Sequence, residues 1–283
     1  MTVGMATGLH LNGATIMTTP TPRQVEIARA AGFDGVEVRA ERLLDAPDEL
    51  YEAARAVHPG EVWSLNGIQL QVRPDGRLDR RRLDAELEPR LAICRDLGAA
   101  YLLVVPPRAA HVERDRAVEA MREGLATIRD RATADGIGVA FEFLGFADCP
   151  IDTPALAGLV VAGLPGVDLV LDSCHWHASG GGSLAGFPTE RLAMVHLNDA
   201  PAKPPRTIED ADRLLPGLGV IDLASLVRQL RAAGHEGPWS LETFNPEYWS
   251  ADPLGIAIEG RSRLDRVLGR PARSGPGEAP WST

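Results

Sequence analysis

The chain has 283 residues, 45% of them hydrophobic, and a formal net charge of −10 at pH 7. This length and apolar content suffice for one large core, such as that of an α/β barrel of about 250 residues. The acidic balance argues against nucleic acid as a partner, because phosphate binding relies on a basic face.

The cysteines and the N-terminus indicate where the protein works. Cys94, Cys149 and Cys174 are unevenly spaced and none belongs to a CxxC pair, so we expect no disulfide framework and a cytoplasmic protein. The opening stretch MTVGMATGLHLNGA has no basic region ahead of an apolar core, and no stretch approaches about 18 uninterrupted apolar residues. We therefore predict neither a signal peptide nor a membrane span.

Strand-like and helix-like segments alternate through the first half of the chain. The predicted strands cover 3–9, 33–38, 62–70 and 101–105, and the predicted helices cover 22–32, 41–57, 79–97 and 112–134. Pro22 lies in the first turn of its helix, and Gly32 and Gly98 end two of the helices, as proline and glycine commonly do.

The same alternation continues to residue 268. Strands are predicted over 138–143, 167–172, 192–197 and 238–243, and helices over 153–162, 221–234 and 256–268. The glycine-rich stretch SGGGSLAG at 179–186 is predicted to be poorly structured.

Eight strands, each followed by a helix or a helix-like segment, predict the fold class α/β and a single-domain (β/α)8 TIM barrel over 1–268. A doubly wound sheet is the alternative, although no GxGxxG motif follows the first strand. The last stretch, 269–283, is rich in Gly and Pro and is predicted to be a disordered C-terminal tail.

Four predicted strands of the second half end on metal-binding side chains, namely Glu142, Asp172, His196 and Glu242. The intervals between them are 30, 24 and 46 residues, which leaves room for a helix between parallel strands. Apolar residues flank the ligands, as Phe141 and Phe143 flank Glu142, so the four side chains are expected to face the barrel axis together. Four buried charged groups need a partner, and one ion at the C-terminal ends of the strands would provide it.

Six motifs carry a resemblance to a known family: GFDGVEV at 32–38, FEF at 141–143, LDSCHWHASGG at 171–181, VHLND at 195–199, LLPGLGVIDL at 214–223 and SLETF at 240–244. Together they resemble the xylose-isomerase-like TIM barrels, over most of the chain. This superfamily includes ketose 3-epimerases, hydroxypyruvate isomerases, inosose and dehydroshikimate dehydratases and, distantly, endonuclease-IV-type nucleases.

The resemblance implies a metal site and a set of roles. Glu142, Asp172, His196 and Glu242 would bind one divalent ion, and His175 would meet the substrate. In the epimerases of the family the two glutamates also transfer protons, so Glu142 and Glu242 are the candidate catalytic residues. The carboxylate-rich ligand set favours a harder ion such as Mn²⁺ or Mg²⁺, with Co²⁺ or Zn²⁺ as alternatives.

The sequence departs from the ketose 3-epimerases in two places. Phe143, Leu144 and the residues after them replace the Asn-Arg pair that follows the first glutamate, and the family arginine after the histidine strand falls on Ala202. We take Arg213, just ahead of the PGLG turn, as the substitute in preference to Arg206. The remaining candidates for substrate binding are His175, His177 and Glu37; His177 could instead bind a second metal, and Glu37 could instead pair with Arg39.

Three functions are compared. The leading one is a metal-dependent isomerase or epimerase of a small keto sugar, polyol or hydroxy-keto acid, which moves a proton beside a carbonyl through an enediolate. A dehydratase of the inosose or dehydroshikimate type shares that first step but expels water, with His175 or His177 as its general acid. An endonuclease would need more histidines and a basic groove. We expect a small-molecule substrate, and a homo-oligomer would match the dimers and tetramers common among relatives.

Overall fold

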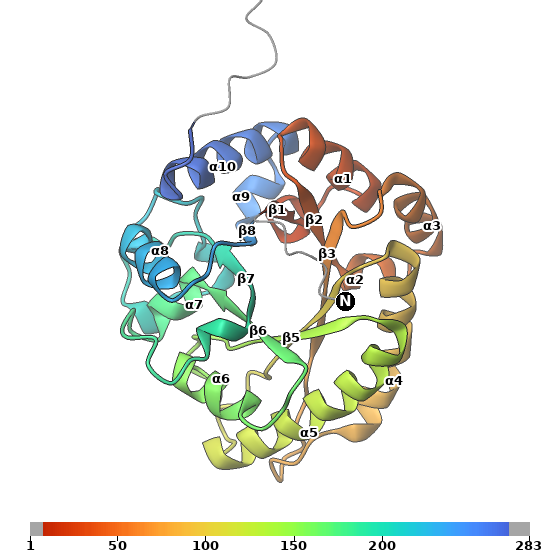
Figure 1. Cartoon of the computed structure of the whole chain (residues 1–283), viewed down its shortest axis with the longest axis vertical. Coiled ribbons are helices and arrows are strands. Elements are labelled where there is room, and N and C mark those ends of the chain that lie inside the picture. Colours follow the sequence, from red (N-terminus) through yellow and green to blue (C-terminus); the bar gives the residue numbers. More distant parts are fainter. Residues whose placement is uncertain (1–7, 272–283) are drawn as a thin grey trace, which may run out of the picture.

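Eight parallel strands close into one barrel, as shown by the computed structural model, which describes residues 8–271 (Figure 1). The strands are β1 (Leu9–Asn12), β2 (Gly35–Arg39), β3 (Val62–Gln69), β4 (Tyr101–Val105), β5 (Gly138–Glu142), β6 (Val167–Asp172), β7 (Leu192–Leu197) and β8 (Trp239–Leu241). Each strand pairs with its sequence neighbours, and β8 pairs with β1. The predicted (β/α)8 fold is confirmed.

Helices surround the barrel as an outer ring (Figure 1). The α-helices are α1 (Thr21–Ala30), α2 (Ala40–Leu43), α3 (Pro47–Ala56), α4 (Arg80–Leu97), α5 (Arg114–Ala132), α6 (Pro154–Val161), α7 (Ser173–Ala178), α8 (Leu223–Ala232), α9 (Pro246–Trp249) and α10 (Pro253–Val267). Short 3-10 helices are η1 (Gly13–Ile16), η2 (Thr133–Asp135), η3 (Thr189–Arg191), η4 (Pro205–Thr207) and η5 (Asp210–Asp212). None of the helices within residues 8–271 is long and apolar enough to cross a bilayer.

Two sequence predictions about elements need correction. The helix expected over 41–57 is divided into α2 and α3, because Pro47 begins α3 and Ala46 before it has left the helical conformation. The first strand begins at Leu9 rather than covering 3–9, and residues 3–7 lie outside the described part of the chain. Of the predicted tail 269–283, residues 272–283 also lie outside it.

The barrel interior is closed at its N-terminal end. Small and apolar side chains fill its middle, namely Leu103, Ala140, Val170, Ala193 and Met194. Below them Trp63 packs between His10 and Tyr101, with ring centroids 5.5 and 5.4 Å apart, and the Tyr101 hydroxyl donates to Asp168. The open end is therefore the C-terminal one, where barrel enzymes place their active sites.

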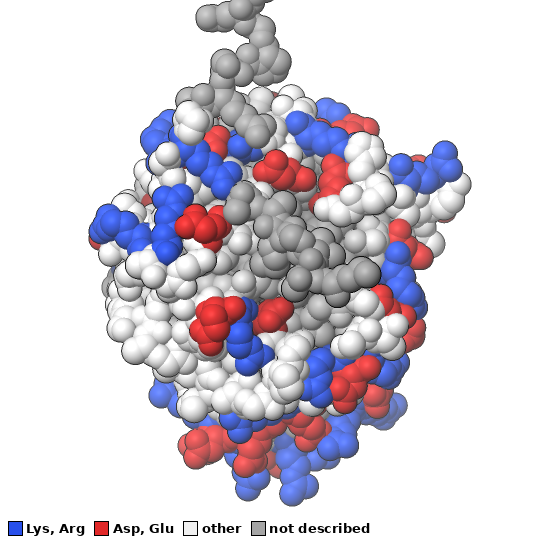
Figure 2. All heavy atoms as spheres, viewed as in Figure 1, with Lys and Arg blue, Asp and Glu red and all other residues white. Residues whose placement is uncertain are grey.

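Charges are mixed on the face of the molecule that Figure 2 shows. On the face seen in Figure 2, Lys and Arg alternate with Asp and Glu around the rim and do not gather into one basic groove. This distribution matches the acidic net charge, and the rim visible there forms no continuous basic track for a phosphate backbone.

Candidate metal centre

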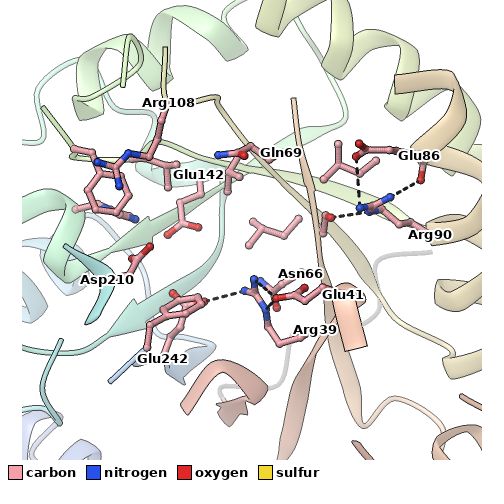
Figure 3. A pocket seen from close by; sticks show the side chains of 18 of the residues that line it. Arg39, Glu41, Asn66, Gln69, Glu86, Arg90, Arg108, Glu142, Asp210 and Glu242 are labelled. Atoms are coloured by element: carbon pink, nitrogen blue, oxygen red, sulfur yellow. Dashed lines mark hydrogen bonds and ion pairs between the residues drawn. The ribbon is translucent and has the colours of Figure 1, made fainter. Parts of the chain in front are cut away.

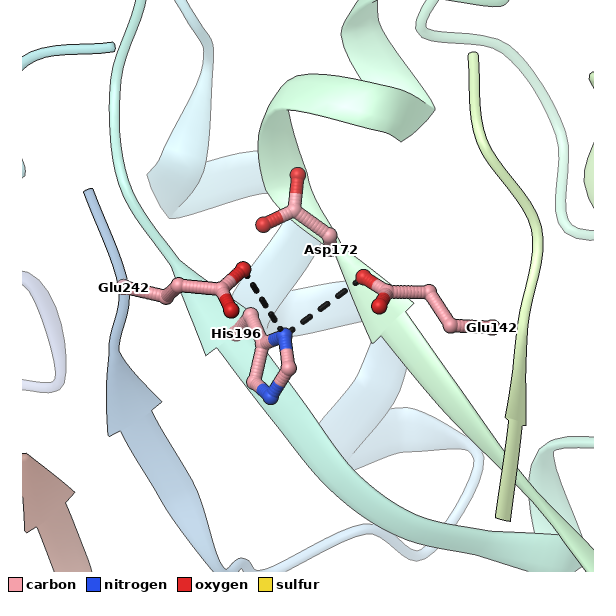
Figure 4. A group of neighbouring side chains, drawn as sticks. All are labelled: Glu142, Asp172, His196 and Glu242. Atoms are coloured by element: carbon pink, nitrogen blue, oxygen red, sulfur yellow. Dashed lines mark ion pairs between the residues drawn. The ribbon is translucent and has the colours of Figure 1, made fainter. Parts of the chain in front are cut away.

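Four side chains meet at the open end of the barrel. Glu142 and Asp172 are the last residues of β5 and β6, His196 lies in β7, and Glu242 follows β8. One possible ligand atom from each lies within 4.8 Å of the others, and all four residues are buried. Figure 4 shows the side chains pointing toward one another from separate strands.

Strand geometry brings these residues together. Phe141, Leu171, Val195 and Leu241 pack outward in the core between strands and helices. Because successive side chains alternate between the two faces of a strand, the residue next to each of them faces the barrel axis. Asp172 and His196 are also register partners across β6 and β7, which fixes their relative height.

The cluster fits a divalent cation. His196 Nδ1 lies 3.4 Å from Glu142 Oε1 and 3.1 Å from Glu242 Oε2, yet neither His196 Nδ1 nor Glu142 Oε1 has a hydrogen-bond partner within residues 8–271. Burial, reinforced by the neighbouring Glu242 and Asp172 carboxylates, raises the pKa of Glu142 to about 7. A bound cation would accept these lone pairs and remove the repulsion between the carboxylates.

Glu37 orients the histidine. His196 Nε2 lies 3.2 Å from Glu37, which also accepts hydrogen bonds from Ser64 Oγ at 2.7 Å and Asn12 Nδ2 at 3.3 Å. Burial opposes the charge of Glu37, but His196 outweighs it and lowers the pKa of the carboxyl. A histidine that donates Nε2–H to an anion would direct its Nδ1 lone pair toward a cation bound among the four side chains.

Glu37 thus lies beneath His196 and does not line the substrate cavity, which was one of the two roles expected of it, and its partners are Asn12, Ser64 and His196 rather than Arg39. The reason is the inward direction of its side chain from the middle of β2, below the strand ends. Asn12, which sequence reasoning missed, also donates to Glu242 Oε1 at 2.9 Å and so connects Glu37 with the candidate ligand Glu242.

Arg213 is buried between two of the candidate ligands. Its Nη1 donates to Asp172 Oδ2 at 3.1 Å and to Glu242 Oε2 at 2.8 Å. Its Nη2 lies 2.9 Å from His175 Nε2 and 2.7 Å from Asp210 Oδ1. The guanidinium also lies 5.1 Å from the centre of the Phe244 ring. The structure therefore places Arg213 beside Asp172 and Glu242 and in the lining of the cavity, and its role in substrate binding stays a prediction.

Asp199 fixes the loop that carries Arg213, and sequence reasoning did not single it out. Its carboxylate accepts from the backbone N–H groups of Gly217, Gly219 and Ile221 at 2.9 to 3.0 Å. Its backbone pairs with Leu214, next to Arg213. A Cβ at Gly219 would lie 2.1 Å from a backbone oxygen, so the turn requires glycine there. The sequence feature that could have identified Asp199 is its position as the acidic residue that ends the VHLND motif.

The two histidines of the LDSCHWH motif occupy different surroundings. His175 donates its backbone N–H to Asp172 Oδ1 at 2.8 Å and lines the cavity against Phe146. Burial and Arg213 hold the pKa of His175 well below its usual range, so the ring is neutral. His177 lies on the same short helix but does not line the cavity, contrary to expectation, because α7 directs it away.

A cavity of about 350 Å³ adjoins the four-residue cluster (Figure 3). Glu142, Glu242, His175 and Arg213 form one end, and Arg82, Glu86 and Arg90 of α4 form the other. Its apolar wall consists of Ile68, Leu103, Val105, Leu144, Phe146 and Phe244. A small organic substrate can therefore lie beside the candidate metal ligands.

Comparison with known proteins gives both a family and two reaction types. A family model described as xylose isomerase-like TIM barrel matches residues 25–267. Inosose isomerase of Bacillus velezensis is 28% identical over 254 residues, which cover 85% of this chain and 90% of that protein. The 3-dehydroshikimate dehydratase of Pseudomonas aeruginosa is 30% identical over 268 residues, which cover 89% of this chain but 40% of that protein.

Solved structures share the fold. A crystal structure of the IOLI protein with a zinc atom has a TM-score of 0.81 and 25% identity, covering 93% of this chain and 98% of that one. The 3-keto-D-glucoside 4-epimerase YcjR from E. coli has a TM-score of 0.67 at 20% identity, covering 92% and 98%, which shows the fold alone.

Proposed function

The chain belongs to the xylose isomerase-like TIM barrel family and is a sugar-related isomerase or dehydratase, and we propose that it is a divalent-metal-dependent isomerase or epimerase. The substrate would be a small keto sugar, polyol or hydroxy-keto acid. The observation that carries the proposal is the approach of Glu142 and Glu242 to one point from β5 and β8, on opposite sides of His196 (Figure 4). Such a pair can remove a proton from one side of a bound carbon and return one from the other.

The candidate ligands are Glu142, Asp172, His196 and Glu242. Their three carboxylates favour Mn²⁺ or Mg²⁺, and the zinc atom of the IOLI protein keeps Zn²⁺ among the candidates. A divalent ion at this position would polarise a carbonyl oxygen and stabilise negative charge that develops on it.

The protein groups would then carry out the proton transfer. One glutamate accepts the proton beside the carbonyl, which gives the enediolate of the substrate, and the other returns a proton to the neighbouring carbon or the opposite face. Arg213 keeps Glu242 and Asp172 in place through the contacts of its Nη1. Phe146, Leu144 and Phe244 cover the cavity wall and limit access of water to the reacting carbons.

The second candidate is a dehydratase, which the identity with 3-dehydroshikimate dehydratase favours. That reaction needs an acid to protonate the leaving hydroxyl. His175 is the histidine at the cavity, but it is held neutral, and its Nε2 accepts a hydrogen bond from Arg213. A neutral imidazole is a weak acid, and this supports the isomerase.

Mass spectrometry in deuterated water distinguishes the two reactions. The Mn²⁺-loaded enzyme is incubated with an inosose and, separately, with 3-dehydroshikimate. An isomerase or epimerase gives a product of unchanged composition that carries solvent deuterium. A product lighter by one water would overturn the proposal in favour of the dehydratase.

A further inference from the structure

Arg108 joins three of the loops at the open end of the barrel. It lies between β4 and α5 and lines the cavity (Figure 3). Its Nε donates to both carboxylate oxygens of Asp148, between β5 and α6, at 2.8 and 2.9 Å. Its Nη1 and Nη2 donate to the two oxygens of Glu209, between β7 and α8, at 2.6 and 3.0 Å. One guanidinium group therefore bridges to residues 40 and 101 positions away in the sequence.

The segment 201–212, called the strap below, has little apolar anchoring of its own. The structure describes all of its residues, and among them only Ile208 is buried. Besides the bridge from Arg108, a second contact holds the strap to the loop after β5, where Arg206 donates to Asp152 at 2.9 Å. Polar contacts with neighbouring loops therefore hold the strap, because few buried apolar contacts are available to do so.

The strap carries one of the partners of Arg213. Glu209 is the N-cap of η5, and Asp210, the first residue of η5, lies 2.7 Å from Arg213 Nη2. The backbone N–H of Glu209 donates to Asp212 at 3.1 Å, which completes a capping box around this short helix. The hydrogen bonds from Arg108 to Glu209 thus fix the start of the helix that contacts Arg213.

A second route from Arg108 to Arg213 passes through aromatic rings. The Arg108 guanidinium lies 4.3 Å from the centre of the Phe146 ring, and that ring meets His175 edge to face at 4.9 Å. His175 Nε2 in turn lies 2.9 Å from Arg213 Nη2. Both routes end on Arg213, whose Nη1 donates to Glu242 at 2.8 Å.

We propose that Arg108 is a positioning residue for the proton transfer: it holds three loops together and, through Glu209 and Phe146, fixes the place of Arg213 and so of Glu242. The inference rests on the proposed function, in which Glu242 transfers a proton. A planar guanidinium suits this role, because it can bind two carboxylates and stack on a ring at the same time.

Hydrogen exchange of the whole chain tests the bridge without a substrate. In Arg108→Gln the backbone amides of the strap and of 143–149 should both exchange about tenfold faster, because the two loops lose their common partner. The amides of β5 and β7 should exchange as in wild type. Unchanged exchange in both loops would overturn the proposal.

Arg95→Gln is the matched control. Arg95 also bridges two carboxylates, Asp135 at 2.7 Å and Glu88 at 2.9 Å, and its side chain is 40% exposed against 38% for Arg108. Its partners lie on α4 and η2, away from the cavity. The strap of this variant should exchange as in wild type, and an equal acceleration in both variants would show that loss of any such arginine loosens the protein.

A double-mutant cycle separates the bridge from two independent effects. Glu209→Gln removes the carboxylate of the strap that binds Arg108, so it should also accelerate exchange of the strap. Because both substitutions break one interaction, the double variant should exchange no faster than Arg108→Gln alone. Accelerations that multiply in the double variant would contradict a shared bridge.

The split between kcat and KM tests positioning against substrate binding. The probe is an inosose in deuterated water with the Mn²⁺-loaded enzyme. In Arg108→Gln, kcat for deuterium incorporation should fall about tenfold while KM changes by less than about threefold, because the placement of Glu242 is lost and no substrate contact is. A raised KM with unchanged kcat would make Arg108 a substrate ligand and overturn the proposal.

NMR of the chain labelled with ¹⁵N-arginine follows Arg213 directly. Its buried Nε has no hydrogen-bond partner within the described residues, so the exchange of this N–H with water reports how closely the side chain is enclosed. The signal is identified by its loss in Arg213→Lys. It should exchange about tenfold faster in Arg108→Gln and at the wild-type rate in Arg95→Gln.

This measurement distinguishes failure of the inference from failure of the proposed function. An Arg213 signal that Arg108→Gln leaves unchanged would overturn the inference, whatever the enzyme does to the inosose. If Arg108→Gln accelerates the exchange of Arg213 but the wild-type enzyme leaves the inosose unaltered, the proposed function fails for that probe and the control of Arg213 by Arg108 stands.

Discussion

The candidate ligands differ in how firmly their oxygens are held. Asp172 accepts hydrogen bonds from the His175 backbone, Asn198 and Arg213. Glu242 accepts from Asn12 and Arg213, whereas Glu142 Oε1 has no hydrogen-bond partner within the described residues. The carboxylate of Glu142 is therefore held by fewer hydrogen bonds than that of Glu242. We expect both glutamates to transfer protons and the side chain of Glu142 to be the more mobile.

Removing either proton-transfer group should stop turnover. Glu242→Gln and Glu142→Gln keep the side-chain volume but lose the base, so we expect kcat to fall by far more than tenfold while circular dichroism reports an unchanged fold. Activity within tenfold of wild type, about 1.4 kcal/mol in the barrier, would exclude that glutamate from the mechanism.

The carboxylate under His196 should tune ion binding. Glu37→Gln retains an acceptor for Nε2–H but loses its charge, so affinity for Mn²⁺ should fall about 10- to 100-fold in calorimetry. Glu61→Gln serves as the control, since Glu61 pairs with Arg29 away from the cavity. Equal affinities for the two variants would show that Glu37 does not act through the histidine.

Ion binding should depend on pH because protons compete for the same atoms. The pKa of Glu142 is raised from 4.5 to about 7. Between these pH values the folded, metal-free protein therefore holds one more proton than the unfolded chain. As pH rises from 4.5 to about 7, loss of the proton from Glu142 lowers the stability of the metal-free fold. Over the same pH range the affinity for Mn²⁺ rises, because fewer protons compete for the carboxylate. Titrations in buffers of different ionisation enthalpy should show proton release below about pH 7; an affinity independent of pH from 5 to 8 contradicts this.

Between β7 and α8, a single carboxylate organises the loop that delivers Arg213. Asp199→Asn removes one acceptor and places an amide N–H₂ against the N–H groups of Gly217 and Gly219. We expect kcat/KM to fall roughly 10- to 100-fold, because a displaced Arg213 no longer restrains Glu242. Asp222→Asn, at the exposed cap of α8, alters the same connection away from the site and should leave kcat/KM near wild type. Similar losses of kcat/KM in both variants would show that either substitution loosens the whole connection between β7 and α8, and that Asp199 has no specific effect on Arg213.

The second half of the barrel could be predicted from the sequence because its strands obey a simple rule. In β5 to β7, apolar residues face the helices and an inward-facing metal-ligand side chain lies at or next to the end of each strand, so Glu142, Asp172 and His196 stand out. Strands β1 to β3 instead direct several polar side chains inward. Asn12 and Asn66 are 54 residues apart in the sequence, and their side chains meet only because the closed barrel brings β1 and β3 together.

The cavity wall was the other part that the sequence concealed. Arg82, Glu86 and Arg90 follow one another on a surface-like face of α4, where charged residues usually meet only solvent. Their place at the end of the cavity opposite the metal centre depends on the packing of α4 against β3. Helical periodicity identifies such a face as polar but not as part of a cavity.

For the molecule as a whole, ion binding should stabilise the fold. Four ligands come from four strands spread over 101 positions of sequence, so an ion that binds them only in the folded chain shifts the unfolding equilibrium. At about 100 times Kd the gain is about 2.7 kcal/mol, which should raise Tm by several degrees in a thermal melt. A chelator should reverse the rise, and a Tm unchanged by Mn²⁺, Mg²⁺ and Zn²⁺ would contradict an ion site of this kind.

The central claim is that one divalent ion lies where β5, β6, β7 and β8 end. Anomalous diffraction from crystals grown with Mn²⁺ tests it most directly, because it locates the ion without reference to activity. We predict one strong peak per chain, about 2.0–2.4 Å from an atom of Glu142, Asp172, His196 and Glu242 each. A peak elsewhere, or none at this position at saturating Mn²⁺, would contradict the account.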